Sequence, residues 1–185
     1  MRAALAVLGL GAVGALGGTS ARAEPLPAGS IGVIVGAVSG TGADANNLGY
    51  GYVLGGQAAW QPMNTDQRLN FSAKWTAQFA TMYGAGASRV NDQLLTLQMD
   101  LTAGIRIRPG VNPSRYITLR GGGALFRADQ VIPPKMFRAF AGAIATVGME
   151  QYISGWLLNI DVRYGLIGTG PTEVGLVIGF SKTGG

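Results

Sequence analysis

The sequence predicts an all-β fold, a closed up-and-down antiparallel transmembrane β-barrel of about eight strands. Polar and apolar residues alternate almost without interruption over 68–83 and 95–108, as in strands with one polar and one apolar face. Both runs exceed the about 5–6 residues of most soluble strands and reach the about 9–11 residues that cross a bilayer. Only 12% of the residues are charged, about half the usual globular share of roughly 25%.

Each predicted strand is an alternating segment bounded by clusters of Gly, Pro, Asn and Asp. In the third segment, Phe71 and Trp75 share the apolar face, while Ser72 and Lys74 share the polar face. The fourth segment repeats this pattern with leucine and isoleucine on one face. In chain order the eight segments are 30–39, 48–60, 68–83, 93–108, 116–126, 137–152, 156–166 and 172–180.

The connecting segments alternate in predicted length. Outer-membrane barrels place short turns on the periplasmic side and longer loops outside. With an even number of strands, this alternation predicts that both termini lie in the periplasm. The longer connectors are 40–47, 84–92 and 127–136, and the shorter ones are 61–67, 109–115 and 153–155.

The first residues have the features of a secretory signal peptide. Arg2 provides a positive start, residues 3–18 are apolar, and Ala21, Arg22 and Ala23 form a small-x-small cleavage site. The predicted organisation is therefore a signal peptide at 1–23, a short periplasmic segment at 24–29, the barrel at 30–180 and a short tail at 181–185.

The composition excludes several classes of function. Without cysteine or histidine, the chain lacks disulfides, a thiol nucleophile, a Ser-His dyad and the usual zinc ligands. We expect no enzyme, cofactor or metal site, and a carboxylate pair of Asp161 and Glu173 is the one catalytic arrangement left open. The net charge of +5 includes Arg2 and Arg22 of the predicted signal peptide and contains no block of like charges, so nucleic acid is not an expected partner.

Three segments near the C-terminus carry a resemblance to a known family: 147–152 (VGMEQY), 158–164 (LNIDVRY) and 174–180 (VGLVIGF). They are similar to the last hairpin and final strand of the small eight-stranded outer-membrane barrels, such as the OmpA transmembrane domain and OmpX-like proteins. The resemblance implies export to the bacterial outer membrane, with its lipid and lipopolysaccharide, the barrel assembly machinery and other envelope proteins as partners. Family members usually end at a terminal aromatic assembly signal, whereas here residues 181–185 follow Phe180.

Charged residues on the polar strand faces are the first candidate site. An eight-stranded barrel is just wide enough for side chains to fill it, and a buried unpaired charge costs several kcal/mol, so we expect these charges to pair. Pairs are expected mainly within the last three strands and with Arg120, one strand earlier. The network is either a static polar core or a narrow gate that opens when ion pairs exchange partners. Its residues are Lys74, Asp100, Arg106, Arg120, Glu150, Asp161, Arg163 and Glu173.

The outer loops are the second candidate site. Segment 127–137 is the longest predicted loop, and its apolar residues beside Pro133 and Pro134 form either a docking knob or a loop folded onto the barrel rim. Guanidinium groups near this edge suit lipopolysaccharide phosphates. The candidate contacts for lipopolysaccharide or a partner are Arg89, Arg127, Lys135, Met136, Phe137 and Arg138.

Aromatic residues near the strand ends predict a girdle at each membrane interface. The outer girdle is expected to contain Tyr50, Tyr52 and Tyr83. The inner girdle is expected to contain Trp60, Phe71, Tyr116, Trp156 and Phe180.

Three functions remain open from the sequence. The first is an integral outer-membrane barrel with a structural, surface-interaction or envelope-complex role. The second is a narrow channel or transporter for ions or small solutes, gated by the luminal charges. The third is a secreted soluble barrel with an apolar cup, because alternation alone does not say which face of the strands is inside.

Overall fold

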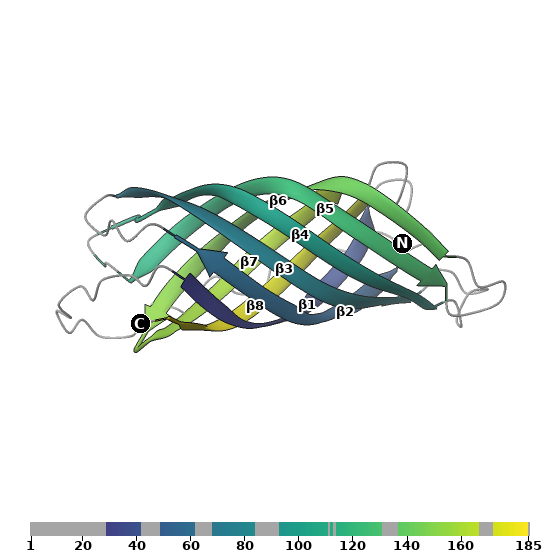
Figure 1. Cartoon of the computed structure of the whole chain (residues 1–185), viewed down its shortest axis with the longest axis horizontal. Helices are drawn as coiled ribbons and strands as arrows, with labels where there is room; N and C mark the ends of the chain where they lie inside the picture. Colours follow the sequence, from purple (N-terminus) through teal and green to yellow (C-terminus); the bar gives the residue numbers. More distant parts are fainter. Residues whose placement is uncertain are drawn as a thin grey trace, which may run out of the picture.

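Eight antiparallel strands close into one barrel, with the strands inclined to its long axis (Figure 1). The computed structural model describes residues 29–41, 49–61, 68–83, 93–110, 112, 114–130, 137–166 and 172–184. The predicted signal peptide lies outside these residues. In chain order the strands are β1 (Gly29–Thr41), β2 (Tyr50–Trp60), β3 (Leu69–Tyr83), β4 (Gln93–Ile107), β5 (Arg115–Gln130), β6 (Phe137–Ile153), β7 (Trp156–Leu166) and β8 (Thr172–Thr183).

The strand order confirms the predicted up-and-down topology. Each strand pairs with its neighbours in sequence, and β8 pairs with β1, placing Ser30 opposite Thr183. The end of the barrel where β1 begins and β8 ends is called the turn end here, and the opposite end is the loop end. Within the described ranges, no helix is long and apolar enough to cross a membrane.

At the turn end, β6 and β7 are joined by only two residues, as the short connector at 153–155 predicts. Ser154 and Gly155 have φ angles of 48° and 80°. Two successive positive φ angles give a hairpin turn whose twist matches that of the flanking strands. The other connections do not follow the predicted lengths as closely, because 61–68 at the turn end is as long as 42–49 at the loop end.

Two predicted strand ends are wrong. β5 continues to Gln130, where its ladder with β6 still pairs Asp129 with Phe137, so the connection between them spans 131–136 rather than 127–136. β8 continues to Thr183, and Lys182 pairs with Ile31 of β1. The predicted tail therefore contributes three residues to the barrel, and the alternation simply continues beyond Phe180.

The two faces of the strands differ in polarity in the way a membrane barrel requires. Mid-strand leucines on the outside are exposed, including Leu54 at 63% and Leu101 at 62%. The inward face is buried and mostly polar, from Ser72 and Thr76 on β3 to Gln98 on β4. This orientation contradicts the alternative of a soluble barrel with an apolar cup, which needs apolar side chains inside.

Within the described part of the chain, the lumen also contains two apolar clusters. Both lie between the charged middle of the lumen and the loop end, at inward positions of the strands. One consists of Ile34, Val38, Val53, Ala80 and Val177, and the other of Ala124, Phe126 and Ile144.

One predicted girdle residue is misplaced. Tyr116 is 1% exposed and lies in the lumen, because it shares the inward face of β5 with Thr118 and Arg120. The side chain of Tyr83 lies outside the description. The remaining predicted girdle residues are exposed on the outer surface, at 40–66%: Tyr50, Tyr52, Trp60, Phe71, Trp156 and Phe180.

Candidate functional site

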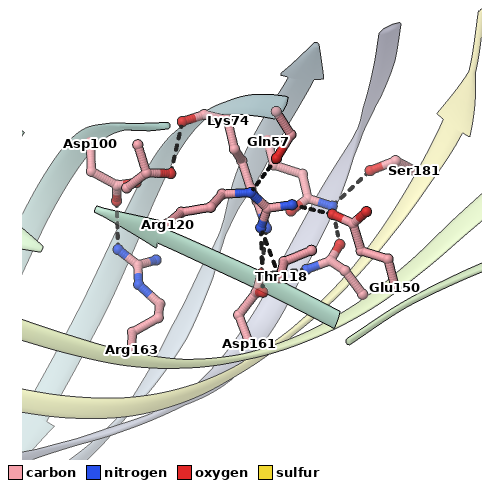
Figure 2. A network of polar contacts seen from close by, with 12 residues as sticks. Gln57, Lys74, Asp100, Thr118, Arg120, Glu150, Asp161, Arg163 and Ser181 are labelled. Carbon is pink, nitrogen blue, oxygen red and sulfur yellow. Dashed lines mark hydrogen bonds and ion pairs between the residues drawn. The ribbon is translucent and has the colours of Figure 1, made fainter. Parts of the chain in front are cut away.

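The central part of the lumen is occupied by a chain of ion pairs, which we call the central network. Glu150 accepts hydrogen bonds from Arg106 Nε (2.7 Å) and from the Nη2 of Arg120. Arg120 lies between Glu150 and Asp161 (Figure 2), with its Nη1 3.6 Å from Asp161 Oδ1. Lys74 Nζ donates to Asp161 Oδ2 at 2.6 Å. These five residues come from β3, β4, β5, β6 and β7, so the ion pairs tie distant walls of the barrel together.

Neutral side chains extend the central network to β2 and β8. Asn159 Nδ2 donates to Asp161 Oδ2 at 2.8 Å. The Nε2 of Gln57 donates to Asn159 Oδ1 (2.6 Å) and to Ser181 Oγ (2.7 Å). Ser181, assigned to the tail by the sequence, is fully buried in the lumen.

A second group of contacts lies nearer the loop end, and we call it the loop-side network. Arg163 donates to Asp100 Oδ2 at 2.5 Å and to the Oε1 of Gln78. Gln98 also contacts Arg163, with its oxygen 2.7 Å from Arg163 Nη2 when its amide nitrogen faces Glu173 Oε1 at 3.0 Å. In that orientation, Gln98 connects the Glu173 carboxylate to the Arg163 guanidinium.

At the turn end, two tyrosines cover the central network. The guanidinium carbon of Arg106 lies 4.1 Å from the ring centre of Tyr116 and 5.6 Å from that of Tyr152. The two rings meet edge to face, with centroids 6.2 Å apart. Gln61 and Arg106 both donate to the Tyr152 hydroxyl. Arg106, which is 0% exposed, is thus enclosed by a carboxylate on one side and aromatic rings on the other.

Among the side chains that the structure describes, the buried charges balance. Four cations (Lys74, Arg106, Arg120 and Arg163) face four carboxylates (Asp100, Glu150, Asp161 and Glu173), and all eight are at most 7% exposed. Such a set is tolerated in a barrel interior because nearly every member has an oppositely charged neighbour. Between the two networks lies a cavity of about 10 Å³, which is room for about one water.

The structure places all eight predicted network residues in the lumen. Arg120 pairs with Glu150 and Asp161 of the last three strands as predicted, but the other pairs differ from the prediction. Arg163 pairs with Asp100 of β4, and Asp161 pairs with Lys74 of β3, so these partners lie across the lumen rather than on the last strands. Asp161 and Glu173 belong to different networks and form no carboxylate pair. Sequence reasoning missed Tyr116, Tyr152, Gln57, Asn159 and Ser181, although all except Tyr152 occupy buried inward positions that alternation along their strands indicates.

Glycines opposite the long side chains explain why the pairs cross the lumen. Gly148 lies opposite Asp161, and a Cβ built at Gly148 would be 2.0 Å from Asp161 Oδ1 and 2.6 Å from the Ile160 carbonyl oxygen. Gly175 of β8 lies opposite Arg163. Because one of the two neighbouring strands offers no side chain at these positions, each long charged group has space to extend inward.

Replacing Gly148 by alanine is expected to lower the free energy of unfolding by about 1–3 kcal/mol, the usual cost of overpacking. The new methyl group would displace the Asp161 carboxylate from Lys74 and Arg120. Urea titration of the folded barrel measures this loss. The control is Gly121→Ala on the exposed face of β5, where the nearest atom is 3.8 Å away; a loss as large as that of Gly148→Ala would contradict the steric explanation.

The predicted outer-edge residues are only partly within the description. Arg127 belongs to β5 rather than to a loop as predicted. Phe137, the last residue of the predicted loop, begins β6, and Arg138 lies in β6 as the predicted strand 137–152 requires. Ladder register places Arg127 opposite Ala139 and Ala128 opposite Arg138, on neighbouring strands at the loop end. Arg89, Lys135 and Met136 lie outside the described residues.

Several solved structures share this barrel. It matches Neisserial surface protein A with a TM-score of 0.62 and 13% identity, over 87% of this chain and 100% of that one. It matches OprG from Pseudomonas aeruginosa with a TM-score of 0.57 and 12% identity, over 86% and 97%. For Ail, the attachment invasion locus protein of Yersinia pestis, the TM-score is 0.56 at 13% identity, over 86% and 98%.

These matches confirm the predicted fold class. The chain has the fold of the small eight-stranded outer-membrane β-barrels. No protein-family model matches the sequence, and no curated protein matches it. With identities of 12–13%, the likeness extends to the fold and not to a particular activity.

Proposed function

We propose that this protein is an integral barrel of the bacterial outer membrane with a closed lumen, and that it acts through its surface rather than as a pore or an enzyme. Its role is in envelope integrity, surface interaction or membership of an envelope complex. The observation that carries this proposal is the filled lumen, where Arg106, Glu150, Arg120, Asp161 and Lys74 form one continuous chain of ion pairs.

The outer surface supports a place in a lipid bilayer. Large apolar side chains such as Ile31, at 73% exposure, and Leu125, at 64%, occur on every side of the barrel. An apolar surface of this extent is unusual on a soluble monomer, whereas lipid solvates it well. Trp156 and Phe180 stack at the turn end with ring centres 4.5 Å apart, as expected for an interfacial aromatic girdle.

The expected partners are outer-membrane lipid, lipopolysaccharide, the barrel assembly machinery and other envelope proteins. Arg127 of β5 and Arg138 of β6 lie on neighbouring strands at the loop end, and the sequence adds Arg89, Lys135, Met136 and Phe137 as further candidate contacts. Guanidinium groups suit phosphate oxygens. A structure of Ail in complex with the heparin analogue sucrose octasulfate is a precedent for anion binding on this fold.

A narrow gated channel is the second candidate. Glu150 is shared by Arg106 and Arg120, and Asp161 is shared by Lys74 and Arg120. A carboxylate that already contacts two cations can exchange partners with little movement. Such an exchange would break the chain of ion pairs without leaving a charge unpaired.

Conductance in planar lipid bilayers tests whether the lumen is closed or forms a gated channel. We expect the reconstituted protein to give no single-channel steps at either polarity, because the paired charges fill the lumen. Steps that disappear in Arg163→Ala would overturn the closed barrel and support the gated channel. The control is Arg115→Ala, since Arg115 binds Gln151 at the turn end and takes no part in either network.

A further inference from the structure

The cavity between the two networks is lined by groups from opposite walls of the barrel. Lys74 and Thr76 of β3 face it from one side, and Thr146 of β6 and Arg163 of β7 face it from the other. Thr76 lies directly opposite Asp100 in the β3–β4 ladder, and Thr146 lies directly opposite Arg163 in the β6–β7 ladder. The cavity therefore lies between the Lys74–Asp161 and Asp100–Arg163 ion pairs, which cross the lumen.

Buried polar atoms without partners are concentrated at this cavity. In the described part of the chain, eight buried side-chain atoms have no hydrogen-bond partner, and four belong to residues that line the cavity. All four residues are more than nine-tenths buried, with exposures of 2–7%. The atoms are Thr76 Oγ1, Thr146 Oγ1, Asp161 Oδ1 and Arg163 Nε; Asp161 Oδ1 lies 3.6 Å from Arg120 Nη1, an ion-pair contact beyond hydrogen-bond distance. Leaving such groups without partners costs about 1–3 kcal/mol each, so their gathering at one cavity points to a ligand.

We propose that the cavity is a built-in binding site for one water molecule that joins the central and loop-side networks. Its volume of about 10 Å³ matches the space one water needs. A buried water typically makes about three hydrogen bonds to otherwise unpaired polar groups. Here it accepts from Arg163 Nε, donates to Asp161 Oδ1, and completes its bonds with the threonine hydroxyls, which both donate and accept.

The chemistry of the lining selects water over an ion. Two cations, Lys74 and Arg163, and two carboxylates, Asp100 and Asp161, line the cavity, so no net charge attracts an ion of either sign. A metal cation cannot accept the N–H of Arg163. A halide cannot donate to the carboxylate of Asp161. Water satisfies both because it donates and accepts.

Replacing Thr146 by valine tests this site, because valine keeps the shape and removes the hydroxyl. With water bound, the variant loses one of its partners, and the urea concentration of half-unfolding falls. If the cavity is dry, valine removes an unsatisfied buried hydroxyl, and the midpoint stays or rises, which would overturn the proposal. The matched control is Ser30→Ala, since the Ser30 hydroxyl is also buried and unpartnered but does not line the cavity; its midpoint should not fall.

A crystal structure of the full chain, grown with bromide, provides a second and independent test. We expect one solvent peak within hydrogen-bonding distance of Arg163 Nε and Asp161 Oδ1, without anomalous signal from bromide. An empty cavity overturns the proposal, and so does a bromide peak, which would make the site an anion site. Neither result bears on whether the barrel conducts, so failure of this inference is distinct from failure of the proposed function.

Discussion

Replacing Glu150 by alanine is expected to lower the free energy of unfolding by about 3–5 kcal/mol, the cost of removing one partner from a buried ion pair. The loss falls in the upper part of this range because Glu150 serves two cations. Arg106 and Arg120 are 0% and 2% exposed, and both would keep a buried charge with one partner fewer. Urea titration of the protein folded into lipid vesicles measures the loss through tryptophan fluorescence.

The matched control for this prediction is Glu173→Ala. Glu173 is the same residue type and is nearly as buried, at 6% exposure compared with 3% for Glu150. It forms no ion pair with any residue the structure describes, and its contact is the neutral amide of Gln98. We expect a loss of about 1 kcal/mol, typical of one hydrogen bond. Equal losses for the two variants would contradict a stabilising role for the central network.

Alternation along the strands is sufficient to predict the fold and the inward residues. A single period of two residues assigns Lys74, Arg120 and Asp161 to one face and Trp75 and Leu119 to the other. The low charge content then favours lipid outside and charges inside, and the structure confirms that the charges lie inside. Applied to β5 without exception, the same rule places Tyr116 beside Arg120 in the lumen, whereas the position of this aromatic residue near a strand end, taken alone, predicts a girdle residue.

The partners of the luminal charges could not be predicted in the same way. Alternation predicts the face of the strand on which a residue lies, but not how far its side chain extends across the lumen. The pairs Lys74–Asp161 and Asp100–Arg163 cross the lumen between strands distant in the chain. The deciding feature is the pattern of small residues opposite them, such as Gly148 opposite Asp161. That pattern has meaning only once the ladder register is known.

Replacing Leu101 by arginine is expected to lower the free energy of unfolding in lipid by about 2–4 kcal/mol, the cost of an arginine on the lipid face near the bilayer midplane. Leu101 is 62% exposed and lies near the middle of β4 (Gln93–Ile107). If the barrel spans a membrane, this side chain contacts the acyl chains, where a guanidinium loses its hydration. Urea titration in phospholipid vesicles measures the effect.

The matched control, Leu166→Arg, separates the cost of placing an arginine in lipid from the cost of placing an arginine anywhere on the outer surface. Leu166 is 52% exposed but is the last residue of β7 (Trp156–Leu166), where a membrane-spanning strand reaches the interface. There the expected cost falls to about 0–1 kcal/mol. On a water-exposed surface both substitutions would change stability by no more than about 0.5 kcal/mol. A large loss at Leu101 with little loss at Leu166 therefore requires a solvent that is apolar at mid-strand and polar at the strand end, and a bilayer provides that environment.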